Sequence, residues 1–300
     1  MNESFFDAIK RGFLGLPTAI RAFIGISVAM YLLQVIGSFI TVQGQNGNRW
    51  LIQALAFQPE MPDAFIQIWR FFTYLFLHGS PFHLIFNMLW LWWMGRPVEE
   101  RIGPRSFTTL FLGAGIGGAL LDIALSLIFG TANVIGASGA VYGIMVAFAM
   151  LYPTVPIMLF LLPPLEARYV VAGIIVIDVL FLGTGDGVAR IVHLGGAATG
   201  YLIMKAYLQG ADLSTPIRAI ERLWMESPTT RKGREFGPKN SNIRSVFQKT
   251  NNSEEISDVD VLEENESNEL DLILEKIAKS GYDGLTKREK NRLFELSKKK

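Results

Sequence analysis

One glycine-flanked serine and three histidines are the residues of this chain whose types suggest chemistry. Ser138 lies in the run GASGAVYG at positions 136–143, and the histidines are His78, His83 and His193. Acyl transfer by a serine needs a base such as histidine to take the hydroxyl proton, and N–H groups to bind the oxyanion. The glycines beside Ser138 leave backbone N–H groups accessible at the start of a helix. A serine nucleophile with a histidine base is therefore the first hypothesis.

Glycines follow both candidate residues at helical spacing. Gly139 and Gly143 are four residues apart, and so are Gly196 and Gly200, which follow His193. Small residues at this spacing share one helix face and let two membrane helices approach closely. Helix packing alone is the alternative role for these glycines. If the two faces meet, the serine hydroxyl can reach the imidazole of His193.

His83 and Asn87 are four residues apart, so they share one helix face. Their side-chain donors could bind an oxyanion together with the backbone N–H of Ser138. A metal site at His78 and His83 is disfavoured, because their five-residue spacing splits the faces and no carboxylate lies close in sequence. His78 alone fits equally well a structural histidine bonded to a neighbouring carbonyl. We expect no metal and no cofactor.

Composition indicates a membrane core with a polar appendage. Apolar residues make up 50% of the 300 residues, charged residues 18%, and the formal net charge is +1. The absence of cysteine excludes disulfides, thiolate catalysis and cysteine-bound metals. We expect the lipid bilayer as the environment of the core, and no nucleic-acid partner.

Apolar stretches predict the elements that must position these residues. A membrane span needs about 20 mainly apolar residues to cross a hydrocarbon core of about 30 Å. The stretches that meet or approach this length are residues 22–42, 81–95, 107–129, 136–153, 169–183 and 191–208. The sequence therefore predicts an all-α membrane protein with six transmembrane helices. Residues 43–79 are too polar to cross and too aromatic for a plain linker, so we expect them at the membrane interface.

Basic residues predict the orientation of these spans. The side with more Lys and Arg in short loops is cytoplasmic. One side holds Lys10, Arg11, Arg21, Arg96, Arg101, Arg105, Arg168, Lys205 and Arg218, and the other holds Arg49, Arg70 and Arg190. Both termini are therefore expected in the cytoplasm, and the chemistry-bearing residues near the outer ends of the spans.

Charge and periodicity divide the chain into four parts. Residues 1–20 are expected to be a cytoplasmic lead, residues 21–210 the six-helix domain, residues 211–269 a flexible linker, and residues 270–300 a small helical module. The linker is basic at first and then acidic. In the module, apolar residues recur at helical spacing, and Thr286 with Glu289 forms a capping-box pattern.

Taken together, these motifs resemble the rhomboid intramembrane serine proteases. The resemblance rests on the glycine–serine run with Tyr142, on His83 with Asn87, on His193 with Gly196 and Gly200, and on the pair Trp69 and Arg70 in the first outer loop. It covers residues 20–208. The C-terminal segment is similar to a short cytoplasmic module of some bacterial rhomboids, and the sequence does not indicate its partner.

The resemblance implies a fold, an activity and a role for each residue. It implies a six-transmembrane-helix rhomboid bundle with a small helical cytoplasmic tail, in the inner membrane of a bacterium. Ser138 and His193 would form a catalytic dyad that cleaves transmembrane protein substrates near the outer interface. The oxyanion would be held by His83, Asn87 and the Ser138 N–H. The supporting residues would be Tyr142, Gly136, Gly139, Gly196 and Gly200, and the structural residues Trp69, Arg70 and Glu99.

Two aspartates and two other protein classes need to be weighed. Asp122 and Asp178 lie near the outer ends of their stretches, and either could be the acid of a Ser-His-Asp triad. The resemblance implies a dyad without an acid, so a helix-end or interhelical hydrogen bond is expected for both. A binding factor without activity would be expected to lack the serine or the histidine. A transporter would carry ionisable residues along a midplane path, whereas here they gather at one end.

Overall fold

The computed structural model describes residues 5–42, 44–130, 132–158, 163–184 and 189–225, and also Ile273, Lys276, Thr286, Lys290 and Leu293. The chain divides into two compact units, Met1–Glu235 and Phe236–Lys300. In the second unit the Lys290 N–H donates to the Thr286 carbonyl at 3.0 Å, as in a turn of helix. The rest of the predicted C-terminal module, and the acidic part of the predicted linker, lie outside the described residues.

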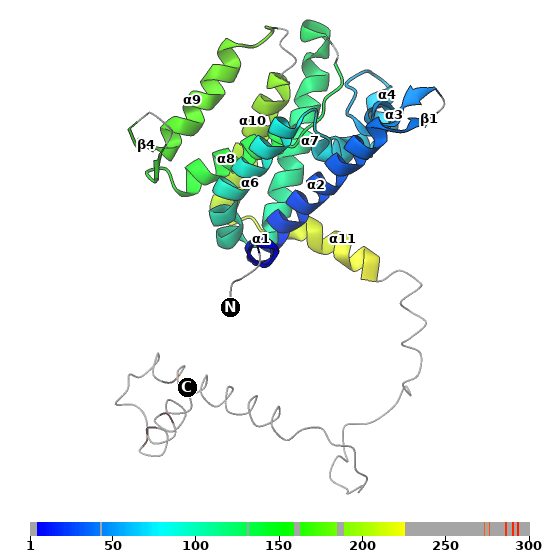
Figure 1. Cartoon of the computed structure of the whole chain (residues 1–300). Helices are drawn as coiled ribbons and strands as arrows, with labels where there is room; N and C mark the ends of the chain where they lie inside the picture. Colours follow the sequence, from blue (N-terminus) through cyan, green and yellow to red (C-terminus); the bar gives the residue numbers. More distant parts are fainter. Residues whose placement is uncertain are drawn as a thin grey trace, which may run out of the picture. The chain divides into compact units, whose positions relative to one another are not determined.

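The first unit is built almost entirely from helices, which confirms the prediction of a mainly helical chain (Figure 1). Its long helices are α2 (Thr18–Ser38), α6 (Pro81–Ile102), α7 (Pro104–Phe129), α8 (Ser138–Leu151), α9 (Ala167–Leu180) and α10 (Arg190–Leu208). Its short helices are α1 (Phe5–Leu14), α3 (Gly47–Leu55), α4 (Asp63–Ile66), α5 (Arg70–Thr73), the 3₁₀ turn η1 (Tyr74–Phe76) and α11 (Thr215–Met225). Two short antiparallel pairs join β1 (Thr41–Val42) to β2 (Gln45–Asn46) and β3 (Pro156–Ile157) to β4 (Leu165–Glu166).

Each long helix overlaps one of the apolar stretches, but the helices differ in their capacity to span a membrane. Within the described ranges, α2 and α7 are long and apolar enough to cross a bilayer by length and composition. Helix α8 is apolar, but its 14 residues extend only about 21 Å. Helix α6 ends in charged residues, which lower its mean hydropathy. Because one or two such helices also occur in soluble proteins, the six spans remain a prediction.

Helices α7, α8 and α10 pack against one another at the centre of the first unit. Between α8 and α10 the contact is made by glycines. A Cβ on Gly196 would overlap the carbonyl oxygen of Gly139, and a Cβ on Gly200 would overlap the Cα of Gly143. The two backbones therefore touch, which no larger residue at these positions would allow.

Glu99 of α6 holds the beginning of α2. The first N–H groups of a helix have no acceptor within the helix. Residue Pro17 precedes α2 and supplies no side-chain cap. The buried Glu99 carboxylate instead accepts hydrogen bonds from the N–H groups of Ala19 at 2.8 Å and Ile20 at 2.9 Å. Its negative charge also lies at the positive end of the α2 dipole.

Side chains of Trp69, Arg70 and Thr73 hold the end of α3. The last carbonyls of a helix lack intrahelical donors. Arg70 donates to the carbonyls of residues 53 and 56, the Trp69 indole donates to that of residue 54, and the Thr73 hydroxyl to that of residue 55. These bonds fold residues 44–79 into an ordered segment with four helical turns or short helices in it.

Helix α11 lies in the segment that the sequence predicted to be a flexible linker. Asp212 accepts from the Ser214 N–H at 2.9 Å and pairs with Arg218. Glu221 forms a salt bridge of 3.0 Å with Arg105 of α7. Local capping and this ion pair therefore order the start of the segment, and its basic composition alone did not indicate either.

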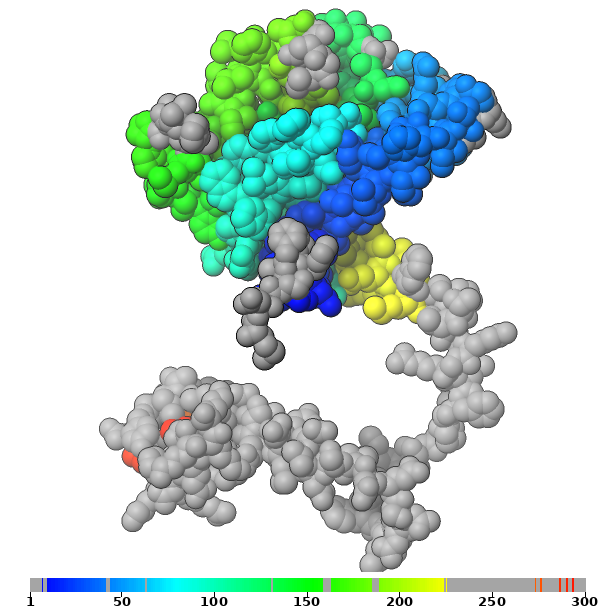
Figure 2. Space-filling view, in the orientation of Figure 1, coloured from blue at the N-terminus to red at the C-terminus, as the bar shows by residue number. Residues whose placement is uncertain are grey.

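Large apolar side chains are exposed along α2 and α6. Figure 2 shows the α2 residues in blue and the α6 residues in cyan as adjoining parts of one face. The exposed apolar residues include Ile26, Leu32, Leu33 and Ile36 on α2 and Phe82, Ile85, Phe86 and Trp92 on α6. Many exposed large apolar side chains on two adjoining helices are typical of a surface that meets a membrane or a partner.

We expect Glu99→Gln to destabilise the first unit without removing the site. The neutral amide loses a charge-assisted acceptor for two buried N–H donors, which should cost about 2 kcal/mol. The measurement is thermal unfolding of the purified protein in detergent. Glu100→Gln is the matched control, because Glu100 is exposed and pairs only with Arg96 of the same helix among the contacts described. Equal melting temperatures for both variants would contradict the capping role.

Candidate active site

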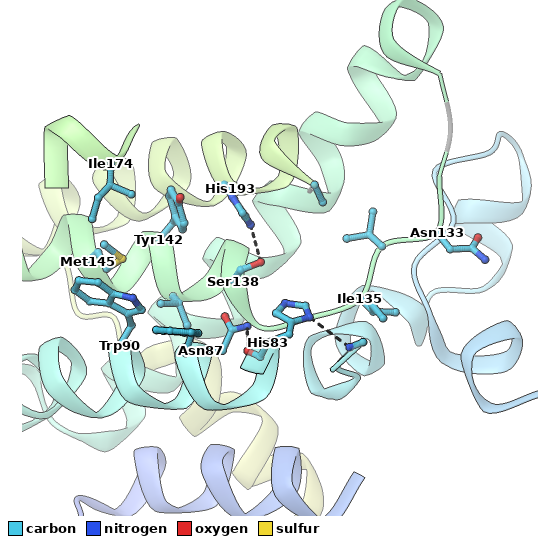
Figure 3. Close-up of a pocket in the computed structure, with 15 residues that line it drawn as sticks. His83, Asn87, Trp90, Asn133, Ile135, Ser138, Tyr142, Met145, Ile174 and His193 are labelled. Carbon is cyan, nitrogen blue, oxygen red and sulfur yellow. Dashed lines mark hydrogen bonds between the residues drawn. The ribbon is translucent and has the colours of Figure 1, made fainter. Parts of the chain in front are cut away.

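Ser138 and His193 are hydrogen-bonded to each other inside the first unit. The Ser138 Oγ lies 2.8 Å from the His193 Nε2, and Figure 3 marks this contact with a dashed line. Ser138 is the first residue of α8 and His193 lies in the first turn of α10. The glycine contact between the two helices brings these ends together. The pair has the geometry of a nucleophile and its general base.

The His193 imidazole is held on two other sides. Tyr142 of α8 stacks on it, with ring centroids 4.4 Å apart and an interplanar angle of 18°. Its Nδ1 lies 2.8 Å from the Oδ2 of Asp178 on α9. The expected interhelical hydrogen bond of Asp178 is thus made to His193 itself. A serine, a histidine and an aspartate are therefore in line, although the resemblance implies a dyad without an acid.

Backbone hydrogen bonds fix the loop that leads into Ser138. Phe57 and Val134 form an isolated antiparallel bridge, with N···O distances of 3.0 and 2.9 Å. The Gly136 N–H donates to the Tyr74 carbonyl at 2.9 Å. Gly136 has φ +119°, a conformation that favours glycine. Residues 44–79 therefore position the loop before the serine.

His83 lies beside this loop with a defined tautomer. Its Nδ1 accepts from the Gly79 N–H at 3.4 Å, so the neutral ring carries its proton on Nε2. A Cβ on Gly136 would lie 2.7 Å from that Nε2. The absence of a side chain at Gly136 therefore lets the His83 donor approach the start of α8, where Ser138 begins the helix.

Asn87 lines the same pocket one helical turn further along α6. Its Nδ2 donates to the carbonyl of His83 at 2.8 Å, as Figure 3 shows. The amide has a second N–H, which leaves it able to donate to another acceptor. Asn87 is 5% exposed, so this donor lies in a site largely shielded from solvent.

His78 has a structural position. Its ring N–H at Nδ1 lies 3.3 Å from the Phe76 carbonyl, and its backbone N–H donates to Gln34 of α2 at 3.0 Å. Burial, and next the nearby His83, lower the pKa of His78 to about 4, so the ring is neutral at neutral pH. The rings of His78 and His83 are 5.1 Å apart, edge to face. His78 therefore packs behind His83.

A pocket of about 600 Å³ opens onto these groups. The polar groups Ser138, His193, His83 and Asn87 lie in the middle of the view in Figure 3, and apolar side chains of α6, α8 and α9 lie to one side of them. The apolar lining includes Phe86, Trp90, Met145 and Ile174. The pocket can therefore take an apolar chain beside a serine hydroxyl.

The remaining predicted residues lie away from the pocket. Asp122 is buried on α7 near Tyr74 and does not line the pocket. Glu99, Trp69 and Arg70 make the helix-end bonds described above. Among the residues that the structure describes, no three His, Asp or Glu side chains are grouped to hold a metal ion.

Sequence reasoning considered Asp178 as the acid of a triad but favoured a helix-end or interhelical hydrogen bond, and it did not distinguish Asp178 from Asp122. An acidic residue within an apolar stretch is costly, and this signal was present at both Asp122 and Asp178. The packing of α9 on α10 determines which of the two aspartates lies next to His193. No residue spacing within either helix encodes that packing.

The fold and this site define a helical-bundle protein with a serine–histidine pair at the meeting point of two helix ends. Residues 66–210 of the chain match the family model of the rhomboid domain. Residues 262–299 match a family of unknown function (DUF6576).

Curated relatives of the chain include bacterial rhomboid proteases. Rhomboid protease GluP of Bacillus subtilis is 31% identical over 195 residues, which are 64% of this chain and 35% of the relative. Rhomboid protease GlpG of Serratia proteamaculans is 29% identical over 152 residues, 48% of this chain and 50% of the relative. Rhomboid protease GlpG of Yersinia pestis is 32% identical over 118 residues, which are 39% of this chain and 37% of the relative. The chain thus spans at most half the length of these relatives.

We expect Gly196→Ala to separate α8 from α10 and to weaken the Ser138–His193 bond. The added methyl group would overlap the Gly139 carbonyl, so the helices must move apart. The expected result is a lower melting temperature and slower labelling of Ser138 by a fluorophosphonate. Gly173→Ala is the control, because a Cβ at this helical position on α9 meets nothing within 4 Å. An unchanged labelling rate in Gly196→Ala would show that the glycine contact does not set the site.

Proposed function

We propose that this protein is an intramembrane serine endopeptidase, with Ser138 as nucleophile and His193 as general base. The observation that carries the proposal is the 2.8 Å hydrogen bond between Ser138 Oγ and His193 Nε2 in a pocket at the N-terminus of α8. Relatives named rhomboid proteases support the same activity.

The reaction follows from these atoms. His193 Nε2 takes the hydroxyl proton as the Ser138 Oγ attacks the scissile carbonyl. The tetrahedral intermediate expels the amine, which receives the proton from His193. Water then attacks the ester, and the same base assists. The oxyanion is bound by the Ser138 N–H, the His83 Nε2–H and the Asn87 amide.

The proposed substrates are transmembrane helices of other proteins. The six long helices would cross the bilayer: α2, α6, α7, α8, α9 and α10. Ser138 would lie near the outer face and both termini in the cytoplasm. The exposed apolar face of α2 and α6 fits contact with lipid. A substrate helix must unwind to expose its peptide bonds, so small or helix-breaking residues near the outer interface would favour cleavage.

We expect Ser138→Ala and His193→Ala each to abolish cleavage of a single-span substrate in detergent, because nucleophile and base act as a unit. Ser138→Ala should also abolish fluorophosphonate labelling. The control is Ser106→Ala, a buried serine on α7, which should be labelled and cleave as wild type does. Cleavage by either purified variant would refute the assignment of the pair.

We expect His83→Ala and Asn87→Ala to slow turnover by about 10²-fold to 10³-fold each, with little change in KM, because each removes an oxyanion donor. Two further variants distinguish the loss of a hydrogen-bond donor from the loss of side-chain volume. Asn87→Asp keeps the size and lacks the amide donor, so it should be as slow as Asn87→Ala, whereas His83→Gln keeps an N–H donor and should lose less than His83→Ala. Rates near wild type would return both residues to a packing role.

A further inference from the structure

Asp178 is a buried carboxylate in contact with the candidate base, and the proposed dyad does not use it. Its residue is 7% exposed, and its Oδ2 lies 2.8 Å from His193 Nδ1. The opposite nitrogen of the same ring bonds Ser138. Three helices supply these groups, α8, α9 and α10. The alignment serine, imidazole, carboxylate is therefore a property of the tertiary packing.

The hydrogen-bonding capacity of each group fixes the position of the imidazole proton. An ionised carboxylate only accepts hydrogen bonds, so Nδ1 must donate and carry the proton. In a neutral ring Nε2 is then bare and can accept from the Ser138 hydroxyl. The opposite tautomer would present a lone pair to the carboxylate and an N–H to the nucleophile, which cannot then lose its proton to the ring.

Other groups from neighbouring helices lie around the Asp178 carboxylate and fix its orientation. The Tyr142 hydroxyl lies near the carboxylate, and the same Tyr142 ring stacks on His193. The Arg190 Nε lies 3.7 Å from Oδ1, with both side chains about nine-tenths buried at 12% and 10% exposure. Groups from α8 and α10 thus surround the carboxylate on α9. The Arg190 guanidinium can only donate, and the Tyr142 hydroxyl can donate to an ionised carboxylate.

We propose that Asp178 is a positioning residue that sets the tautomer and orientation of His193. This inference rests on the proposed protease function. In the reaction the proton moves from Ser138 Oγ to His193 Nε2 and then to the leaving amine. Asp178 takes no proton, and its charge stabilises the imidazolium that exists between the two transfers.

The kinetic test compares Asp178→Asn with Asp178→Glu. In Asp178→Asn the amide oxygen should face the donors Tyr142 and Arg190, so the NH₂ group faces Nδ1 and selects the unproductive tautomer. We expect kcat to fall by about 10²-fold to 10⁴-fold with KM near wild type. Asp178→Glu retains a carboxylate and should recover part of the rate. The matched control is Asp122→Asn, a buried aspartate outside the site, which should cleave like wild type.

A second measurement reads the tautomer directly and needs no substrate. The chain has only three histidines, so ring ¹⁵N labels give few signals, and His193→Ala identifies those of His193. In the wild-type protein near neutral pH we expect protonated Nδ1 and bare Nε2. In Asp178→Asn we expect the reverse.

These measurements separate the two hypotheses. If the wild-type protein neither cleaves the substrate nor is labelled at Ser138, the proposed protease function is refuted. The ¹⁵N spectrum still tests whether Asp178 sets the tautomer of His193. A protease whose Asp178→Asn variant keeps its kcat, or a wild-type His193 with its proton on Nε2, overturns the positioning role. Should Asp178→Asn fail to fold, the wild-type spectrum alone decides.

Discussion

Direct backbone contact between α8 and α10 is the constraint on which the site depends. Ser138 and His193 are 55 residues apart, and their hydroxyl and imidazole meet only because two helix backbones touch at Gly139 and Gly196. A serine side chain is short, so the helix that carries it must come close. Every other feature of the site either preserves this approach or uses it: the stacked Tyr142 fills the space beside the ring, and the pocket lies along its open side.

The second requirement is that the backbone N–H and carbonyl groups at buried helix ends have hydrogen-bond partners within the protein. Glu99 serves the beginning of α2, and the side chains of residues 69, 70 and 73 serve the end of α3. These bonds also have a positional consequence. By ordering residues 44–79 they hold Phe57 and Tyr74, whose backbones bind the loop that enters α8. The side chains of residues 69, 70 and 73 do not line the pocket, but they thus contribute to the placement of the nucleophile.

The sequence predicted the local features well, because they are encoded locally. Apolar length located five of the long helices within about four residues at each end, whereas α6 continues to Ile102, past the predicted end at residue 95. Glycine spacing predicted a close helix contact. Contacts that depend on the relative rotation of helices were not predictable in this way. The bond from Asp178 to His193 belongs to this class, and so does the bridge between Phe57 and Val134. Helix α11 was missed because the segment was judged by its basic composition, which indicates neither the local capping at Asp212 nor the ion pair with α7.

The third requirement concerns charge in the proposed reaction. As Ser138 attacks, negative charge develops on the substrate oxygen and positive charge on His193, in a pocket whose walls are mostly apolar. Because solvent screens charges weakly there, an unpaired charge raises the free energy of the transition state, and a charge with an opposite partner lowers it. The start of α8 and the His83 donor lie on the side of the oxyanion, whereas Asp178 lies behind the imidazolium. With a partner already in place on each side, neither charge requires water to reorganise during the reaction. An aspartate behind the base therefore stabilises the imidazolium more in this pocket than it would at a solvated surface.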